Sequence, residues 1–90
     1  MKIIIEDRNF IDELENLQYE VQARKNIIGY MIEMGQMKTD TFQEYHNEYL
    51  KFFKAYELKK KEIELKYVKP AKKNVKSWNL DFGSGELTID

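Results

Sequence analysis

Two long runs of helical periodicity, separated by one short segment, set the narrowest limit on how this chain folds. In the first run, over residues 10–34, apolar side chains recur every three or four positions. This pattern is typical of a long amphipathic helix, which we expect over residues 9–35. Gly35 is a natural end for it, because glycine readily adopts the left-handed conformation found at helix ends.

The second run follows the connecting segment GQMKTD. Thr41 and Glu44 fit a capping box, in which each side chain satisfies a backbone amide at the helix start. We expect this helix over residues 41–68, because Pro70 disfavours helical geometry at Lys69. A connection this short makes the two helices antiparallel neighbours.

Beyond Pro70 the period of the sequence changes from helical to alternating. Trp78, Leu80 and Phe82 alternate with polar residues before GSG, and Leu87 and Ile89 alternate with polar residues after it. This pattern predicts a β-hairpin over residues 76–90, and a β-branched run predicts a strand over residues 2–5. Two alternatives stay open: the hairpin joins that strand in a three-stranded antiparallel sheet, or it pairs with another chain.

The predicted fold is therefore mainly α. It is an antiparallel hairpin of long helices with a short N-terminal strand and a C-terminal β-hairpin, in a single domain over residues 1–90. One contact between two helices cannot cover two wide apolar stripes. We therefore expect a homodimer that forms a four-helix bundle of coiled-coil type, or binding to a different protein.

Charge is distributed very unevenly along the chain. Residues 1–48 carry a net charge of −5, residues 49–78 carry +7 and residues 79–90 carry −3. In an antiparallel hairpin the acidic start of the first helix lies beside the basic end of the second, so we expect ion pairs between them. The basic residues form a candidate patch: Lys59, Lys60, Lys61, Lys66, Lys69, Lys72, Lys73 and Lys76.

The sequence contains no recognisable motif for catalysis or cofactor binding. It has no cysteine and one histidine. Glu44, His46 and Glu48 are two residues apart, a spacing that points helical side chains away from each other rather than toward one metal ion. We therefore expect no enzyme, no metal, no cofactor and no small-molecule substrate, with His46 partly exposed.

Aromatic and sulfur-containing side chains give the candidate protein interface. Its residues are Tyr45, Tyr49, Phe52, Phe53, Tyr56, Met31, Met34, Trp78 and Phe82. Arg24 interrupts an apolar row of the first helix. We expect its stem to pack on the aromatic rings of the second helix while its head reaches water or Glu57.

These patterns favour a non-catalytic protein–protein interaction module that self-associates, or that serves as an accessory subunit or inhibitor of a larger complex. The alternative is a small nucleic-acid-binding or regulatory protein that uses the lysine-rich end of the second helix. No apolar stretch has the length of a membrane span, and the absence of cysteine suits a reducing compartment. We therefore expect a cytoplasmic protein with no membrane partner.

Overall fold

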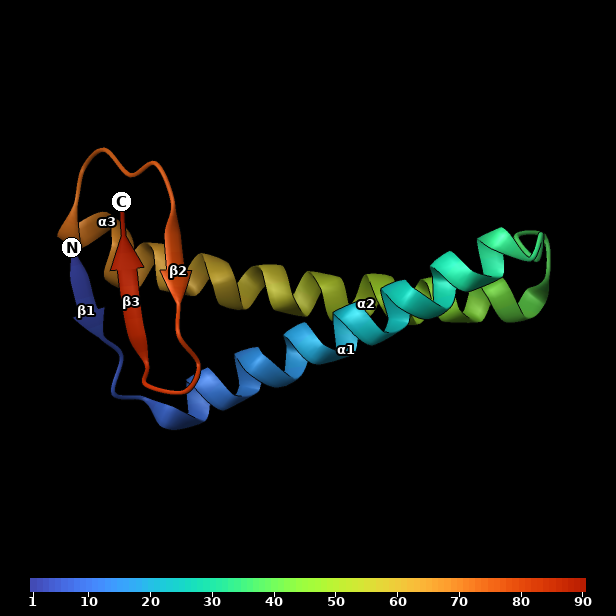
Figure 1. Ribbon diagram of the computed structural model, residues 1–90, viewed down its shortest axis with the longest axis horizontal. Coiled ribbons are helices and arrows are strands. Elements are labelled where there is room, and N and C mark those ends of the chain that lie inside the picture. Colours follow the sequence, from blue (N-terminus) through green and yellow to red (C-terminus); the bar gives the residue numbers. More distant parts are fainter. The chain divides into compact units, whose positions relative to one another are not determined.

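Two long helices account for most of the computed structural model, which describes residues 1–90 (Figure 1). Helix α1 spans Arg8–Glu33 and α2 spans Asp40–Ile63. A π-helix, η1, follows at Glu64–Val68, and α3 adds a last turn at Lys69–Ala71. Helical residues make up 64% of the chain, so the prediction of a mainly helical protein is confirmed.

Three short strands form one antiparallel sheet. Strand β1 is Lys2–Ile4, β2 is Trp78–Leu80 and β3 is Glu86–Ile89, in the spatial order β1-β3-β2 (Figure 1). Leu87 of β3 lies opposite Ile3 on one side and Leu80 on the other. Of the two alternatives for the C-terminal β-hairpin, the structure therefore has the one in which it joins the chain's own N-terminal strand.

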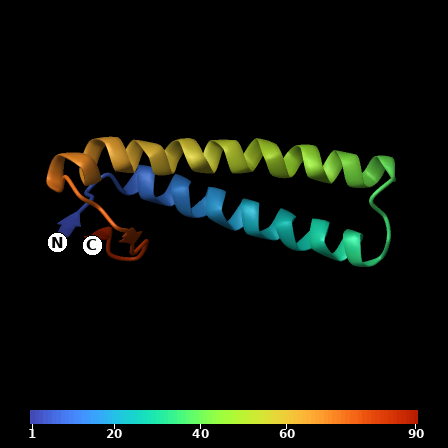
Figure 2. The same ribbon diagram turned by 90° about the horizontal axis from the view of Figure 1, so that it is seen from above.

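The chain divides into two compact units. We call Met1–Glu15 together with Leu58–Asp90 the sheet unit, and Asn16–Glu57 the hairpin unit. Within the hairpin unit, the later part of α1 and the earlier part of α2 run antiparallel and are joined by residues 34–39 (Figure 2). The single domain expected from the sequence stays a prediction.

The apolar core lies in the sheet unit. Trp78 and Phe82, two residues of the predicted interface, are half-buried in this unit. The Trp78 indole donates its N–H to Glu64 Oε1 at 3.3 Å, which keeps one edge of the ring polar. Eight of the nine buried apolar side chains belong to this unit: Ile5, Ile11, Leu14, Ile63, Val68, Leu80, Leu87 and Ile89.

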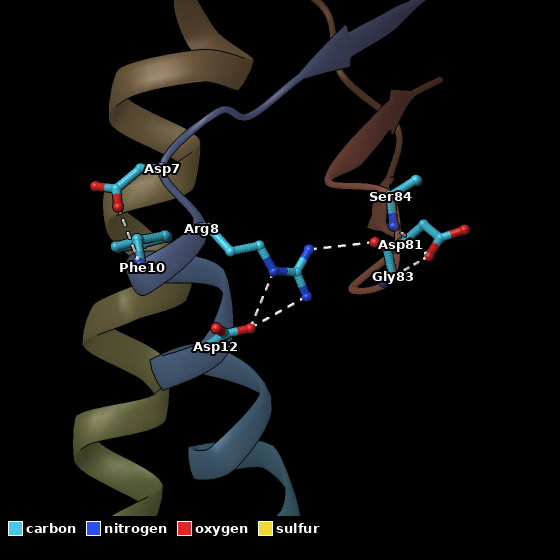
Figure 3. Close-up of polar contacts among 7 residues, drawn as sticks. All are labelled: Asp7, Arg8, Phe10, Asp12, Asp81, Gly83 and Ser84. Carbon is cyan, nitrogen blue, oxygen red and sulfur yellow. Dashed lines mark hydrogen bonds and ion pairs between the residues drawn. The ribbon is translucent and has the colours of Figure 1, made fainter.

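The start of α1 is fixed by two polar side chains (Figure 3). The carboxylate of Asp7 accepts the N–H of Phe10 at 3.1 Å and so caps the helix. Arg8 pairs with Asp12 one turn on and donates to the carbonyl of Gly83 at 3.2 Å. This guanidinium therefore ties the start of α1 to the turn between β2 and β3.

That turn depends on Asp81 and Gly85. Asp81 Oδ1 accepts the backbone N–H groups of Gly83 at 2.8 Å and of Ser84 at 3.3 Å (Figure 3). Gly85 has a positive φ of 77°, and its carbonyl oxygen accepts a hydrogen bond from the N–H of Ile5 at 2.8 Å. The GSG segment therefore serves as the turn that the sequence predicted.

Local hydrogen bonds determine where α1 ends and where α2 begins. Gly35 has a φ of 72°, and the N–H of Gln36 reaches back to the carbonyl of Met31 at 2.9 Å, which is the Schellman pattern. The prediction that Thr41 caps α2 is wrong. Thr39 is the cap, because α2 begins one residue earlier than expected and the N–H of Phe42 bonds to Thr39 Oγ1 at 3.1 Å.

The prediction that Pro70 pushes Lys69 out of helical geometry is also wrong. Lys69 has helical angles (φ −62°, ψ −42°), and α3 continues to Ala71. The N–H of Lys69 bonds to the carbonyl of Glu64, five residues back. In an α-helix a proline ring meets the carbonyl four residues earlier, and a wider π turn moves that carbonyl aside.

We expect Gly85→Ala to destabilise the protein by about 2–3 kcal/mol, since alanine is strained at positive φ. Its Cβ would also stand 2.7 Å from the carbonyl oxygen of Ile5. Urea unfolding followed by circular dichroism measures the change. Gly29→Ala is the control: it meets no atom within 4 Å, and a helical alanine should stabilise by about 0.5–1 kcal/mol. Equal stability of the two variants would contradict this account of the turn.

Candidate interaction surfaces

The hairpin unit buries very little of its apolar surface. Met31, at 6% exposed, is its only buried apolar side chain. Nine large apolar side chains of the same unit are exposed: Tyr19, Ile27, Tyr30, Ile32, Met34, Met37, Tyr45, Leu50 and Phe53. An amphipathic helix gains most of its stability from packing its apolar face, so this unit has apolar surface to cover.

Five of the apolar residues of α1 and its C-terminal end form a stripe that we call the α1 stripe: Tyr19, Ala23, Ile27, Tyr30 and Met34. Their spacings of four, four, three and four residues place them on one helix face. Tyr19 is 72% exposed, Tyr30 is 62% exposed and Met34 is 59% exposed. Neither tyrosine is among the interface residues predicted from the sequence, although their helical spacing is visible there.

A different face of α1 meets α2 around Arg24. The guanidinium lies 4.1 Å from the centre of the Phe52 ring, which confirms the expected cation–π contact. Its acidic partners are Glu20, one turn back, and Glu48 of α2, where Arg24 Nε lies 3.4 Å from Glu48 Oε2. These two acids hold the charge of Arg24, which is half-buried; the expected contact with water or Glu57 stays a prediction.

A groove of about 400 Å³ lies between α1 and α2 in the hairpin unit. Apolar side chains make up most of its lining, with polar atoms only from Lys25, His46 and the hydroxyl of Tyr49. His46 is half-buried and stacks on Phe42 with ring centres 6.0 Å apart. The apolar lining residues are Ile28, Ile32, Met37 and Phe42.

The residues of the predicted interface fall into three groups by burial. Met31 is buried in the hairpin unit. Tyr45, Phe53 and Met34 are exposed, at 36%, 38% and 59%. The remaining five are half-buried: Tyr49, Phe52, Tyr56, Trp78 and Phe82.

One expected ion pair joins α1 to the basic end of α2. Lys59 Nζ lies 2.6 Å from Glu13 Oε2 and 4.9 Å from the centre of the Phe10 ring. The hydrogen bond to Glu13 raises the pKa of Lys59, and the negative charges of Glu13, Glu62 and Asp7 add to the rise against the opposing effect of desolvation. Both salt-bridge partners lie in the sheet unit.

The other exposed lysines of the basic patch have no such partner. No ion pair or side-chain hydrogen bond involves Lys61, Lys66, Lys69, Lys72, Lys73 or Lys76, and all six are exposed. The acids that we expected to face them bond elsewhere or stay solvated, as with Asp12 on Arg8 and Glu20 on Arg24. The expected ion pairs are therefore absent at Lys61 and Lys66 of the predicted second helix, and the four lysines beyond it are unpaired as well.

Glu44, His46 and Glu48 do not form a metal site. No group of three or more carboxylates and histidines is arranged to hold a metal ion. His46 lies against an aromatic ring, and it forms no hydrogen bond with Glu44 or Glu48.

No protein-family model, no curated protein and no solved structure matches this chain. No helix has the length and apolar character that crossing a membrane requires. The two candidate functional surfaces of the molecule are the apolar surface of the hairpin unit and the lysines of the sheet unit.

We expect the Glu13–Lys59 pair to stabilise the fold only below strongly alkaline pH. The pKa of Lys59 in the folded state is raised above the ordinary value of 10.5, which applies in the unfolded chain. The pair therefore contributes its full stability below pH 10.5, and this stability is lost as the pH rises through the folded-state pKa. Glu13→Gln should lower the unfolding free energy by about 0.5–1 kcal/mol at pH 8, and by less as the pH rises above 10.5.

Urea titrations of the wild type and this variant between pH 8 and alkaline pH measure the difference. Glu15→Gln is the matched control, because Glu15 is an exposed acid of the same helix with no ion pair, and its effect should not vary over this range. A constant difference for Glu13→Gln would contradict the assignment.

Proposed function

We propose that this protein is a non-catalytic, self-associating interaction module whose hairpin unit pairs with that of a second copy. The observation that carries the proposal is the poor burial of the hairpin unit, in which Met31 is the one buried apolar residue. Its other large apolar side chains need a surface to pack on, and a second copy offers the same surface by symmetry.

The hairpin unit has apolar surface for an interface of ordinary size. Each partner buries roughly 800 Å² in a standard stable interface. Nine large apolar side chains of this unit are exposed and available for such a contact.

The α1 stripe is the best candidate for the contact. It is more exposed than the aromatic residues of α2, and its two tyrosines belong to the residue types that contribute most to interfaces. Ala23, in the middle of the stripe, would allow two helices to approach closely. The neutral side chains of Gln22 and Asn26 flank the middle of the stripe, and the acidic Glu15 and Glu33 lie on the same flank towards its ends.

Phe52 is a poor residue with which to test this interface. Its ring is half-buried beneath Arg24, so a charged residue there would disturb the packing of the hairpin unit itself. Ile27 is better placed, because it lies on the α1 stripe and is 40% exposed.

We expect the wild type to have a mass near twice 10.9 kDa by light scattering behind a sizing column, at low and at high salt, because the contact is apolar. Ile27→Asp should bring the mass to that of the monomer without loss of helical circular dichroism. Leu50→Asp is the matched control, since Leu50 is 38% exposed in the same unit but lies on the other helix, and it should leave the mass unchanged.

Two results would count against the proposal in different ways. A monomeric wild type at concentrations of about 100 μM, a hundredfold above a micromolar dissociation constant, would reject self-association. A dimer that survives Ile27→Asp would keep self-association and reject the α1 stripe as its interface.

A further inference from the structure

The segment from residue 61 to residue 76 carries a concentration of positive charge that the fold does not neutralise. Its six exposed lysines face only two acids of the same segment, Glu62 and Glu64, and one of these, Glu64, accepts the indole N–H of Trp78. The six are Lys61, Lys66, Lys69, Lys72, Lys73 and Lys76, which we call the lysine surface.

All six lysines lie within sixteen consecutive residues of the sheet unit. The end of α2, the π-helix and α3 carry Lys61, Lys66 and Lys69, and the connection to β2 carries the other three. Six like charges within sixteen residues repel one another, and a bound polyanion would relieve that repulsion.

The rest of this surface indicates which polyanion fits. Leu58 and Leu65 are the only large apolar side chains exposed on the neighbouring helical turns. A helix that lies on a membrane needs a continuous apolar face, and two leucines do not supply one. Three of the lysines lie outside any helix, an arrangement that suits a long row of phosphates.

The aromatic residues nearby present only part of their surface to unpaired bases. The Trp78 ring is half-buried and its N–H is bonded to Glu64, and Tyr67 is also half-buried. The segment contains no arginine, whose planar fork suits specific contacts with base edges, and lysine binds phosphate as a point charge. The surface therefore suits a base-paired duplex contacted through its backbone.

We propose that the lysine surface binds the phosphate backbone of double-stranded nucleic acid without reading its sequence. This inference is independent of self-association, because every lysine concerned lies in the sheet unit and none belongs to the α1 stripe.

The test is the fluorescence anisotropy of a labelled short DNA duplex of mixed sequence, titrated with the full chain at several salt concentrations. If all six lysines contact phosphates, the slope of log K against log salt should be about −5, and affinity should fall roughly a thousandfold between 50 and 200 mM salt. A single strand of the same length should bind no more tightly than the duplex.

The variant Lys72→Gln, Lys73→Gln, Lys76→Gln should reduce the slope to about −3 and weaken binding at 50 mM salt by two to three orders of magnitude. These side chains form no ion pair, so the thermal midpoint should be unchanged. The matched control is Lys38→Gln, Lys51→Gln, Lys54→Gln. It removes the same charge from exposed lysines of the hairpin unit, so it should keep the wild-type slope.

Three outcomes would overturn the proposal. One is the absence of duplex binding by the wild type at 50 mM salt. Another is an equal loss of affinity in the two triple variants, which would indicate attraction by net charge alone. The third is binding to vesicles of phosphatidylcholine and phosphatidylserine at concentrations that leave the duplex unbound, which would assign the lysines to a lipid surface.

Discussion

The sheet unit is organised around its central strand, β3. Leu87 and Ile89 are completely buried, and β3 has an antiparallel neighbour on each side. The first residue of the chain takes part as well, since its amino group donates to the carbonyl of Ile89 at 3.1 Å and the Ile89 N–H donates to the Met1 carbonyl at 2.8 Å. Strands of three or four residues are marginal alone, so both neighbours and the core beneath them are needed.

The two units reach stability by different means. The sheet unit combines a buried apolar core with local polar anchors, such as Arg8 on the Gly83 carbonyl and Asp81 on the turn. The hairpin unit has good helix ends at Gly35 and Thr39 but few buried side chains. Helix ends determine where helices start and stop, whereas packing determines how stable they are. This difference is the physical basis for proposing that the hairpin unit binds another copy.

Charge and apolar surface are also separated between the units. The lysine surface belongs to the sheet unit, and the α1 stripe belongs to the hairpin unit. Two such surfaces can be changed independently by substitution, because no residue belongs to both. A self-associating module that also carries a polyanion surface would present that surface twice, and two linked contacts bind more tightly than one.

Much of the local structure could be predicted from the sequence. The stop at Gly35 depends on neighbouring backbone groups, so a short pattern was sufficient to find it. The two helices and the strands followed from periodicity, because the side chains that pack together repeat with the period of the element that carries them. The sequence alone therefore determined a mainly helical chain with a β-hairpin after residue 75.

The tertiary structure determined which side chains pack and which stay exposed, and periodicity does not reveal this. Apolar rows on two faces of α1 looked alike in the sequence, and only the position of α2 in the hairpin unit determined that Arg24 packs while Tyr19 and Tyr30 stay exposed. Helical geometry continues through Pro70 by way of a π turn, in which the Lys69 N–H bonds to the carbonyl of Glu64, and the presence of a proline in the sequence does not reveal such a turn. The lysines were left unpaired because an ion pair needs two side chains within about 4 Å, and the opposite net charges of two segments do not bring individual atoms that close.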